Sequence, residues 1–445
     1  MRKMEKVISY LIKFLLGEEN EKLVQHVKYG TDTSVAVRIL SSNFFDEDTY
    51  MTSESVPQLP LKEINGIPIL FGESRITKEN GQIIIHADLI ASTFFLISRY
   101  EECVRRDVRD EHGRFIGKES LPYKAGFLGR PIVDEYGVIL RECLRKAGFE
   151  VKEPESGFSH IYLTHDVDQI WTWGNYYRAL RTVIKRIIKN NSDKLQPLKA
   201  VYNYKKYDPV YTFPKMLKWD GELKNCYGSK CQDIYFFMGC EEKTTHDAGY
   251  FSNKKSTKDL TDYLIDSGAE IGIHTSYNAS LNMDLFNREL KNVEDVCHKN
   301  VTKVRNHYLA SREPEDFRVY VDAGISDDFT MGYADVAGFR LGTCRPVRWI
   351  DPVKLELTSL LMHPMTVMEC TLDGKNYMNI TDEEEAFLTV RSLLSQIKKY
   401  NGEVVLLWHS PSVYDNKGSY QRSLYLRVLE QLKNENLIYQ YKREQ

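Results

Sequence analysis

Several features that would assign a protein class directly are absent from this chain of 445 residues. Its eight cysteines are scattered without a Cys-x-x-Cys pair, which excludes a zinc ribbon and a dense disulfide scaffold and predicts reduced, mostly buried thiols. No run of about 18 apolar residues occurs, so we expect no membrane-spanning segment. Internal repeats and low-complexity tracts are also missing, which favours ordinary globular domains.

A strong charge of one sign is lacking as well. Lysine and arginine number 60, and aspartate and glutamate number 63, so the net charge is −3 and no overall field favours nucleic acid as a partner. The first residues are basic, as in a signal peptide, but Lys13 interrupts the apolar stretch and no small-residue cleavage site follows at Gly17. We therefore expect an amphipathic first helix and residence in the cytoplasm.

The length and the hydrophobic content of 42% predict two domains with cores of their own. Residues 1–155 are expected to form a smaller α+β domain, with strands at 34–40, 67–71 and 82–86 and helices at 88–102 and 131–146. Arg99, Glu101 and Glu102 are expected to join the charged segment 105–109 in a structural ion-pair network. The linker composition of residues 153–157 marks the domain boundary.

Residues 156–445 alternate between strand and helix patterns, which predicts a parallel sheet or barrel covered by helices. The expected strands lie at 161–168, 233–239, 270–274, 304–309, 360–368 and 403–408, and the expected helices at 256–267, 284–298, 313–323, 382–399 and 421–434. In such folds the chemistry is placed at the carboxyl ends of the strands.

A helical pattern over residues 171–191 carries several cations, and it has two interpretations. The basic side chains either form a solvated face or contact an anionic polymer or a membrane surface; they are Arg178, Arg181, Lys185, Arg186 and Lys189. The aromatic residues at its start either stack on sugar rings or pack between domains; they are Trp171, Trp173, Tyr176 and Tyr177.

Two carboxylates follow an apolar strand at Thr164-His165-Asp166-Val167-Asp168. Carboxylates two residues apart repel each other, so a site that keeps both usually holds a cation or separates their pKa values. The alternative is an acidic turn in solvent. The choice depends on whether other strand ends supply further ligands.

Other strand ends do supply polar groups of the required kind. His274 ends one expected strand, and His409 ends another. Arg305 and His307 are two residues apart, so the strand period places them on one face. Carboxylate and imidazole together form the ligand set of Zn²⁺, with Mn²⁺, Co²⁺ or Fe²⁺ also possible. Each residue taken alone has a structural alternative, but their coincidence at one rim favours a metal site.

These motifs resemble those of the polysaccharide deacetylases, which include chitin deacetylases and peptidoglycan N-acetylglucosamine deacetylases, and especially a bacterial branch with an extra N-terminal domain. The resemblance covers residues 158–440. In that family, strands end in Thr-Phe-Asp-Asp, His-Ser/Thr-x-x-His, Arg-x-Pro and Leu-x-x-His. The matching stretches here are 164–168, 274–278, 305–308 and 406–409. The resemblance implies an irregular (β/α) barrel of the polysaccharide deacetylase type.

The motifs also depart from the family at two positions. The family's metal-binding aspartate falls on Val167, so the resemblance moves that role to Asp168. Its second histidine falls on Asn278, an amide that binds metal more weakly. His307 stands at the family's proline position, and the strand face makes it our preferred third ligand.

The resemblance implies a role for each site residue. Asp168, His274 and either His307 or Asn278 would hold the ion, Asp166 would act as base and Arg305 would keep Asp166 in place and ionised. His409 would protonate the leaving amine. The backbone N–H of Tyr308 would stabilise an oxyanion, and Trp408 is expected to contact substrate.

The resulting hypothesis is a metal-dependent hydrolase that removes N-acetyl or O-acetyl groups from a carbohydrate, with a bacterial polysaccharide or its precursor as substrate. Two alternatives stay open: a catalytically inactive relative that binds glycan or scaffolds polysaccharide assembly, and an amidohydrolase acting on a non-sugar amide. Either Asp327 or Asp328 orients a catalytic imidazole, or both belong to a solvated acidic loop. His363 is a further candidate for the same cavity. The sequence makes no prediction of the sugar or of the oligomeric state.

Overall fold

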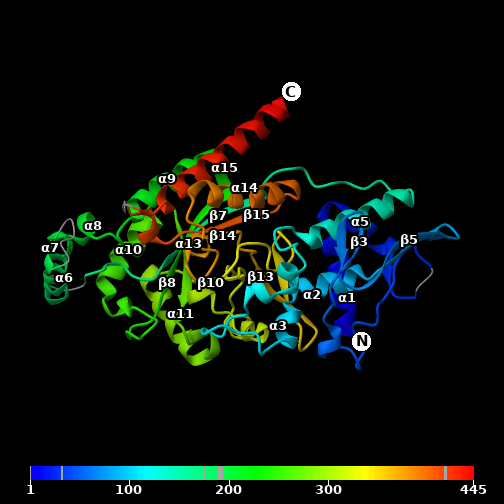
Figure 1. The fold of residues 1–445 in the computed structure, drawn as a ribbon, viewed down its shortest axis with the longest axis horizontal. Helices are drawn as coiled ribbons and strands as arrows, with labels where there is room; N and C mark the ends of the chain where they lie inside the picture. The colour runs from blue at the N-terminus through cyan, green and yellow to red at the C-terminus, as the bar shows by residue number, and fades with distance from the viewer. Residues whose placement is uncertain (1, 32–33, 174–175, 189–193, 415–417, 445) are drawn as a thin grey trace.

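The computed structural model describes residues 2–31, 34–173, 176–188, 194–414 and 418–444 (Figure 1). The residues before 155 form a small sheet with helices packed on it. Its elements are α1 (Arg2–Leu16), β1 (Val27–Tyr29), β2 (Val37–Ile39), β3 (Lys62–Ile64), β4 (Ile67–Ile69), β5 (Gly72–Glu79), β6 (Gln82–Ala87), α2 (Leu89–Ile97), α3 (Tyr100–Val104), α4 (Leu121–Lys124) and α5 (Ile132–Lys146). Four of the strands form a sheet in the order β1-β2-β6-β5, with only the β5–β6 pair antiparallel, and β3 and β4 form a separate antiparallel pair.

The rest of the chain alternates between strands and helices, as expected. Its elements are β7 (His160–Val167), α6 (Tyr176–Ile188), α7 (Gln196–Tyr202), α8 (Tyr204–Tyr207), α9 (Phe213–Tyr227), β8 (Cys231–Met238), α10 (Lys254–Asp266), β9 (Glu270–Thr275), α11 (Met283–Cys297), β10 (Lys303–Asn306), α12 (Arg318–Asp322), β11 (Asp327–Asp328), β12 (Val347–Asp351), β13 (Glu356–Met362), β14 (Val367–Met368), α13 (Glu369–Asp373), α14 (Glu383–Lys399), β15 (Glu403–Leu407) and α15 (Gln421–Glu444).

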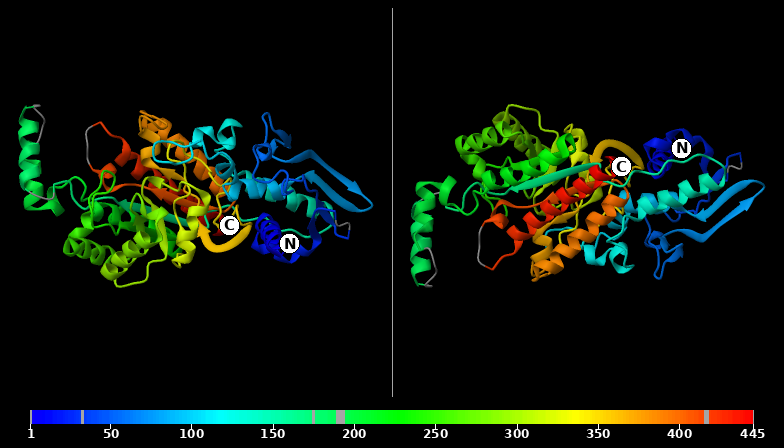
Figure 2. Two further views of the ribbon diagram at one scale, coloured as in Figure 1. Left: turned by 90° about the horizontal axis from the view of Figure 1, so that it is seen from below. Right: turned by 90° about the horizontal axis from the view of Figure 1, so that it is seen from above.

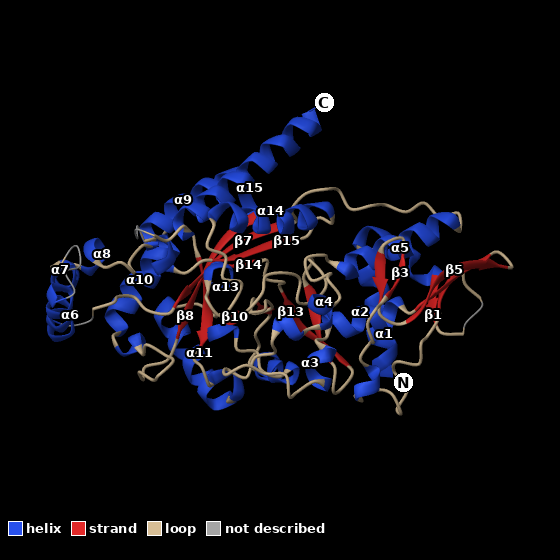
Figure 3. Cartoon of the chain, in the orientation of Figure 1, coloured by secondary structure: helices blue, strands red, loops and turns tan. Residues whose placement is uncertain are grey.

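Nine of these strands form one curled sheet in the order β12-β13-β11-β10-β9-β8-β7-β15-β14. All neighbours are parallel except the β12–β13 pair. Helices cover its outer surface, including α9, α14 and α15 beside β7 and β15 (Figure 3). The expected barrel is therefore an open half-barrel among the described residues, because β12 and β14 are edge strands that do not pair with each other.

The strand period divides β7 into an inner and an outer face. Tyr162 lies inside the curl, where it packs with Phe236 and Phe329 in a buried apolar cluster. Thr164 and Asp166 follow it on the same face. His165 points outward instead, where its ring contacts Asp220 of α9 and the carbonyl of Trp408. Apolar side chains therefore fill one end of the interior of the curled sheet, and Asp166 lies at the other end.

The N-terminal part packs directly on the β12–β13 hairpin. Tyr10 of α1 accepts a hydrogen bond from the backbone N–H of Arg348, and Arg345 donates to the carbonyl of Phe14. One apolar core cluster includes residues from both parts, such as Leu15 and Ile350. The domain boundary expected near residue 155 stays a prediction.

A buried ion-pair network joins the same two parts. Glu102 of α3 lies 2.5 Å from Arg99 and 2.8 Å from Arg340, and all three side chains are almost fully buried. Burial alone would raise the pKa of Glu102, but the two guanidinium groups outweigh it and lower the pKa to about 2. Arg105 pairs with Glu101 in turn. The predicted ion pair between Glu101 and the segment 105–109 is present, whereas Arg99 pairs with Glu102, and Arg340 is a partner that the sequence did not indicate.

Several predicted elements differ in detail. The helix expected over 88–102 breaks at Arg99, whose φ of 60° is left-handed and separates α2 from α3. The strand expected over 304–309 ends at Asn306, and residues 307–309 form a single 3-10 turn. The strand expected over 360–368 is divided between β13 and β14, and the helix expected over 171–191 is α6, with residues 189–191 outside the described part. No described helix combines the length and apolar character needed to cross a membrane.

Candidate metal centre and active site

Asp166 is the last inward-facing residue of β7, and it is bound to a buried arginine. Its Oδ1 lies 3.2 Å from Nη1 of Arg305, and both side chains are nearly inaccessible. Arg305 also donates to the hydroxyl of Thr164 at 2.7 Å and to the carbonyl of Phe329 at 3.0 Å. Burial lowers the pKa of Arg305, while the charge of Asp166 raises it. Arg305 therefore fixes one oxygen of Asp166 and leaves the other facing the site.

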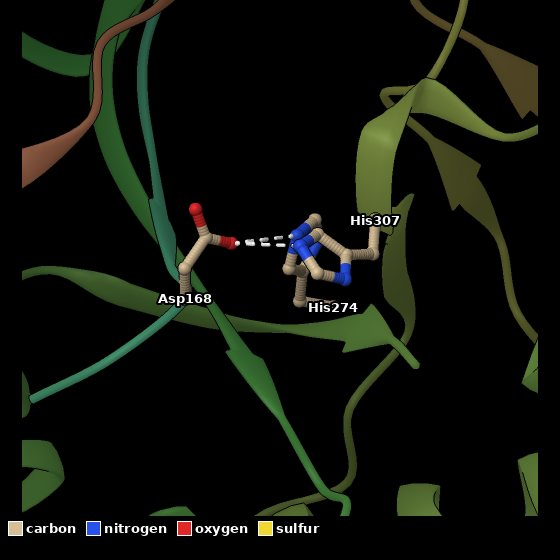
Figure 4. A group of neighbouring side chains, drawn as sticks. All are labelled: Asp168, His274 and His307. Atoms are coloured by element: carbon tan, nitrogen blue, oxygen red, sulfur yellow. Dashed lines mark ion pairs between the residues drawn. The ribbon is translucent and has the colours of Figure 1, made fainter. Parts of the chain in front are cut away.

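Three further side chains converge on one another (Figure 4), and one of them, His274, lies 3.7 Å from Asp166. Oδ1 of Asp168 lies 3.3 Å from Nε2 of His274 and 3.5 Å from Nε2 of His307. His274 ends β9, and His307 starts the 3-10 turn after β10. Asp168, His274 and His307 are hereafter called the ligand triad. Their three ligand atoms all lie within 4.8 Å of one another, a spacing that one cation could bridge.

Two atoms of the ligand triad are buried without a hydrogen-bond partner among the described residues: Oδ1 of Asp168 and Nε2 of His274. An unpaired buried polar atom is costly, and two that face each other indicate a missing partner between them. One carboxylate with two imidazoles is also a donor set that Zn²⁺ and similar ions accept. The triad therefore fits a divalent cation.

The remaining nitrogens of the two histidines are held by hydrogen bonds. Nδ1 of His274 donates to the backbone carbonyl of Arg305 at 3.0 Å, and Nδ1 of His307 donates to Asp247 at 3.0 Å. In a neutral imidazole a proton on Nδ1 leaves a lone pair on Nε2, which is the form that binds metal. Such outer partners orient metal-binding histidines. Asp247 lies in the loop after β8, and the sequence did not indicate it.

His409 borders the site from the end of β15. Its Nε2 lies 3.8 Å from Oδ2 of Asp168 and 3.9 Å from Oδ2 of Asp166, and its Nδ1 lies 2.8 Å from the buried carboxylate of Glu369. Ser412 donates to the same carboxylate. Burial alone would lower the pKa of His409, but Glu369 outweighs it and holds the pKa well above its usual value. His409 can therefore carry a proton toward the site at neutral pH.

Glu369, Cys370 and His409 also lie close enough to hold a cation, but their chemistry does not favour it. Burial raises the pKa of Cys370 to about 11, so its sulfur is a neutral thiol at physiological pH. Nδ1 of His409 is already bound to Glu369. The three residues serve better as a support for His409 than as a second metal site.

A cavity of about 420 Å³ opens beside the ligand triad. Asp168 and His307 line it together with Tyr308 and His246. The rings of His246 and Tyr277 are stacked, with centroids 3.9 Å apart, and both rings meet Tyr308 edge-on. Aromatic faces at the rim of a polar cavity suit flat, partly apolar ligands such as sugar rings.

The N-terminal part contacts Tyr308, one of the residues that line this cavity. Arg114 donates to the carbonyl of Tyr308 at 2.7 Å, and the ring of His112 lies 4.6 Å from that of Tyr308. Tyr308 has a left-handed φ of 59°, which is uncommon for a bulky residue and persists only when the surroundings hold it. Arg312, which follows the turn, donates to the carbonyl of His112 and so holds residues 105–116 against the half-barrel. Residues 105–116 therefore position the turn that carries His307 and Tyr308.

The structure brings together the predicted residues Asp166, Asp168, His274, Arg305, His307 and His409. Asn278 is exposed, whereas the imidazole of His307 lies close to Asp168 and His274, so His307 is the third member of the triad. Tyr308 lines the cavity, and the role expected for its backbone N–H stays a prediction. Glu369 was missed, although it directly follows the apolar strand β14 and so occupied a strand end.

Some expectations about neighbouring residues are wrong. Trp408 is fully buried, and its indole N–H donates to the carbonyl of Gln421, so its side chain packs in the core and not at the cavity expected for substrate. Asp328 binds Thr330, and Asp327 binds His363. His363 in turn pairs with Glu403 at the start of β15, at the opposite end of the strands from the ligand triad. Of the aromatic cluster, Trp171 lines the cavity, whereas Tyr176 and Tyr177 are exposed.

Known proteins show partial likenesses to this chain. Residues 4–148 match the model of a family of unknown function, DUF7033, and no curated protein matches the chain. A solved structure assigned as a polysaccharide deacetylase from Mycobacterium smegmatis is 13% identical, with a TM-score of 0.41, and the match covers 64% of this chain and 86% of that chain. A CE4 family pseudoenzyme from Bacillus anthracis is 14% identical, with a TM-score of 0.29, and the match covers 64% of each chain. A polysaccharide deacetylase from Bacillus cereus is 11% identical, with a TM-score of 0.28, and the match covers 61% of this chain and 88% of that chain.

Proposed function

We propose that this chain is a metal-dependent hydrolase that removes acetyl groups from a carbohydrate. The observation that carries the proposal is the convergence of buried ligand atoms on Asp168 and His274 that make no hydrogen bond, with His307 beside them. A carboxylate–arginine pair and a carboxylate–imidazole pair stand on either side. The motif resemblance over residues 158–440 supports the same reaction class.

The ligand triad would hold the ion, which supplies Lewis acidity toward water and toward the acetyl carbonyl. Asp166 accepts a proton from the attacking water through the oxygen that Arg305 does not bind. The water oxygen forms a bond to the acetyl carbon, and the bond from that carbon to the sugar nitrogen breaks. His409 gives its Nε2 proton to the departing amine, while Glu369 holds Nδ1. The products are acetate and an amino sugar.

The aromatic rim and the cavity volume support a sugar as substrate. Tyr308, Tyr277 and His246 present ring faces and edges beside the ligand triad. A cavity of about 420 Å³ falls in the range of small-ligand sites and leaves room for one or two sugar units. Its rim also carries polar groups, such as Thr244 and Arg178, that can bind hydroxyls.

The test is metal-dependent acetate release by the purified full chain. The protein is stripped with a chelator, reloaded with Zn²⁺, Mn²⁺, Co²⁺ or Fe²⁺, and incubated with N-acetylglucosamine oligomers and O-acetylated xylan. We expect release only after reloading. Asp166→Asn should lower turnover by about 10²–10⁴-fold with unchanged metal content, and His409→Ala should slow sugar amides more than activated aryl esters.

His160→Ala is the matched control, because His160 lies on the same strand as Asp166 but at its far end and half-exposed. It should keep wild-type turnover. If the metal-loaded wild type releases no acetate from either kind of substrate, the hydrolase proposal fails and glycan binding without turnover becomes the better account.

A further inference from the structure

Helix α6 carries a stripe of exposed apolar side chains. The stripe consists of Tyr177, Leu180, Ile184, Ile187 and Ile188, which recur every three or four residues and are between 50% and 78% exposed. The helix stands at the edge of the molecule, away from the β-sheets (Figures 1 and 2). So many aliphatic groups in one exposed row indicate a surface that is covered in use.

The stripe is not a missing contact within the chain, because α6 already buries another face. Ala179 and Val183 are buried, and Ala179 packs with Trp173 and with Ala200 of α7 in a small apolar cluster. Arg186 donates to Gln196 at the start of α7. The helix is thus anchored on one side, and it holds the apolar stripe outward on the other.

The segment around α6 is strongly basic. Residues 169–219 contain eleven lysines and arginines against two aspartates, an excess of nine in a chain whose net charge is −3. One of these aspartates, Asp208, is buried and binds Thr172. Arg181 and Lys185 are exposed and border the apolar stripe along the helix. The surface therefore combines aliphatic side chains with a positive field.

We propose that α6 binds the surface of an anionic lipid membrane, with its axis in the plane of the interface. Basic residues beside an apolar stripe are the pattern of helices that lie at the headgroup boundary. A helix of 13 residues spans about 20 Å and is too short to cross a bilayer. A hydrated anionic polymer would satisfy the cations but would gain nothing from Leu180, Ile184 and Ile187.

Membrane docking would also hold the cavity close to the lipid surface. Trp171 and Arg178, at the base and first turn of the α6 segment, line the same cavity as Asp168 and His307. A substrate presented at a membrane would then meet the ligand triad directly. This consequence rests on the proposed hydrolase function, whereas membrane binding itself does not.

The direct test is sedimentation of the full chain with lipid vesicles. We expect it to bind vesicles of phosphatidylglycerol and phosphatidylcholine, to bind pure phosphatidylcholine far more weakly, and to lose affinity as salt rises. The fluorescence of an Ile184→Trp variant should shift to shorter wavelength on binding. Absence of vesicle binding, or equal binding to both compositions, would overturn the proposal.

Two variants separate the apolar and the electrostatic contributions. Leu180→Ser, Ile184→Ser and Ile187→Ser together should reduce vesicle affinity by tenfold or more, on the order expected for three lost aliphatic contacts. The matched control is Leu281→Ser, Val353→Ser and Leu388→Ser, because these side chains are equally exposed, at 50–52%, on other elements. The control should bind as the wild type does.

Arg181→Gln with Lys185→Gln should weaken binding by about fivefold for each cation removed, and Lys230→Gln with Lys291→Gln is its control. Circular dichroism checks that each variant is folded. Three results contradict the proposal: vesicle binding that survives the triple α6 substitution, binding to dextran sulfate without binding to vesicles, and dimerisation in the absence of lipid that the same substitution abolishes.

Discussion

The tautomer and the charge of His409 are set by a single carboxylate. Glu369 is fully buried and accepts hydrogen bonds from the Nδ1 of His409, the backbone N–H of His409 and the hydroxyl of Ser412. A proton on Nδ1 turns Nε2 toward Asp166 and Asp168, and the negative charge stabilises the doubly protonated ring. Glu369 is therefore a positioning residue for the proposed acid.

Glu369→Gln should retain the shape of this support while removing its charge. We expect kcat to fall by on the order of tenfold to a hundredfold, less than for loss of His409 itself. Because Glu369 raises the pKa of His409, the variant should lose activity at a lower pH on the alkaline side of the pH–rate profile. The measurement is kcat from pH 6 to 10.

Ser412→Ala serves as the control for Glu369→Gln, since it removes one neutral hydrogen bond from the same carboxylate. It should shift the profile little. If kcat of Glu369→Gln falls at the same alkaline pH as kcat of the wild type, the assignment of His409 as acid is contradicted.

Residues at strand ends were predictable, and residues that support them were not. Asp166, His274 and His409 follow apolar strands, so their type and position alone placed them at one rim. Asp247 lies in a loop, where no period fixes its direction, and its role depends on His307 approaching from another strand. Trp408 was misplaced for the opposite reason: it directly precedes His409, and the strand alternation turns it into the core.

At the scale of elements, the buried side chain of His363, between β13 and β14, links two strands of the sheet. His363 lies 2.7 Å from Glu403 at the start of β15 and 3.0 Å from Asp327 at the start of β11, and its ring stacks on Phe329. Burial lowers the pKa of His363, but the two carboxylates outweigh it and raise the pKa to about 9. His363 is thus an imidazolium that bridges two strands across a gap in the sheet.

This bridge predicts a pH-dependent stability. The folded pKa of His363 is above the ordinary value of 6.5, so its contribution is complete below about pH 6.5 and is lost as the pH rises through 9. The shift corresponds to on the order of 3 kcal/mol in the free energy of unfolding. Urea unfolding at pH 6 and pH 10 should show this loss in the wild type and a smaller one in His363→Gln.

His160→Gln is the control, because His160 also approaches Glu403, at 3.9 Å, but is half-exposed. It should retain the wild-type pH dependence. If His363→Gln loses as much stability between pH 6 and pH 10 as the wild type does, the bridge is not the cause.

The segment of residues 105–116 gives a second prediction at this scale. Arg114→Gln removes the hydrogen bond to Tyr308 and the ion pair with Asp110, so the turn after β10 should lose its left-handed geometry part of the time. We expect KM for an acetylated oligosaccharide to rise by about tenfold, with a smaller change in kcat, as for one lost charged hydrogen bond.

Arg106→Gln is the matched control, because Arg106 belongs to the same segment but pairs with Glu313 and Glu315 instead. It should leave KM unchanged. Equal effects of the two substitutions on KM and on the melting temperature would mean that the segment acts only through stability.

The order of elements could be predicted because the β/α alternation is strong, but the curvature of the sheet could not. The short strands β11 and β14 have only two residues each, and their pairing depends on neighbours distant in sequence. The antiparallel strand β12 lies beyond the expected pattern and forms the edge on which α1 and α2 pack. Such contacts arise from the tertiary fold and have no local periodicity.

At the scale of the whole molecule, the half-barrel supplies the ligand triad and the cavity lining, and the N-terminal part supports the site from outside. His112 and Arg114 contact Tyr308, and the two parts share an apolar core. Helix α6 extends from the same cavity toward the proposed membrane surface. The central claim is that the ligand triad of Asp168, His274 and His307 binds one divalent metal ion.

The most direct test is a metal titration of the chelator-treated full chain. Calorimetry measures the stoichiometry and the affinity, and the melting temperature measures the stabilisation. We predict one ion per chain and a rise in melting temperature with metal, since an ion that binds only the folded state stabilises by about 2.7 kcal/mol at a hundred times its Kd. His274→Ala and His307→Ala should each lower the affinity by about a hundredfold or more, and Asn278→Ala should not change it. Unchanged affinity in His307→Ala, or a loss in Asn278→Ala, would contradict the account.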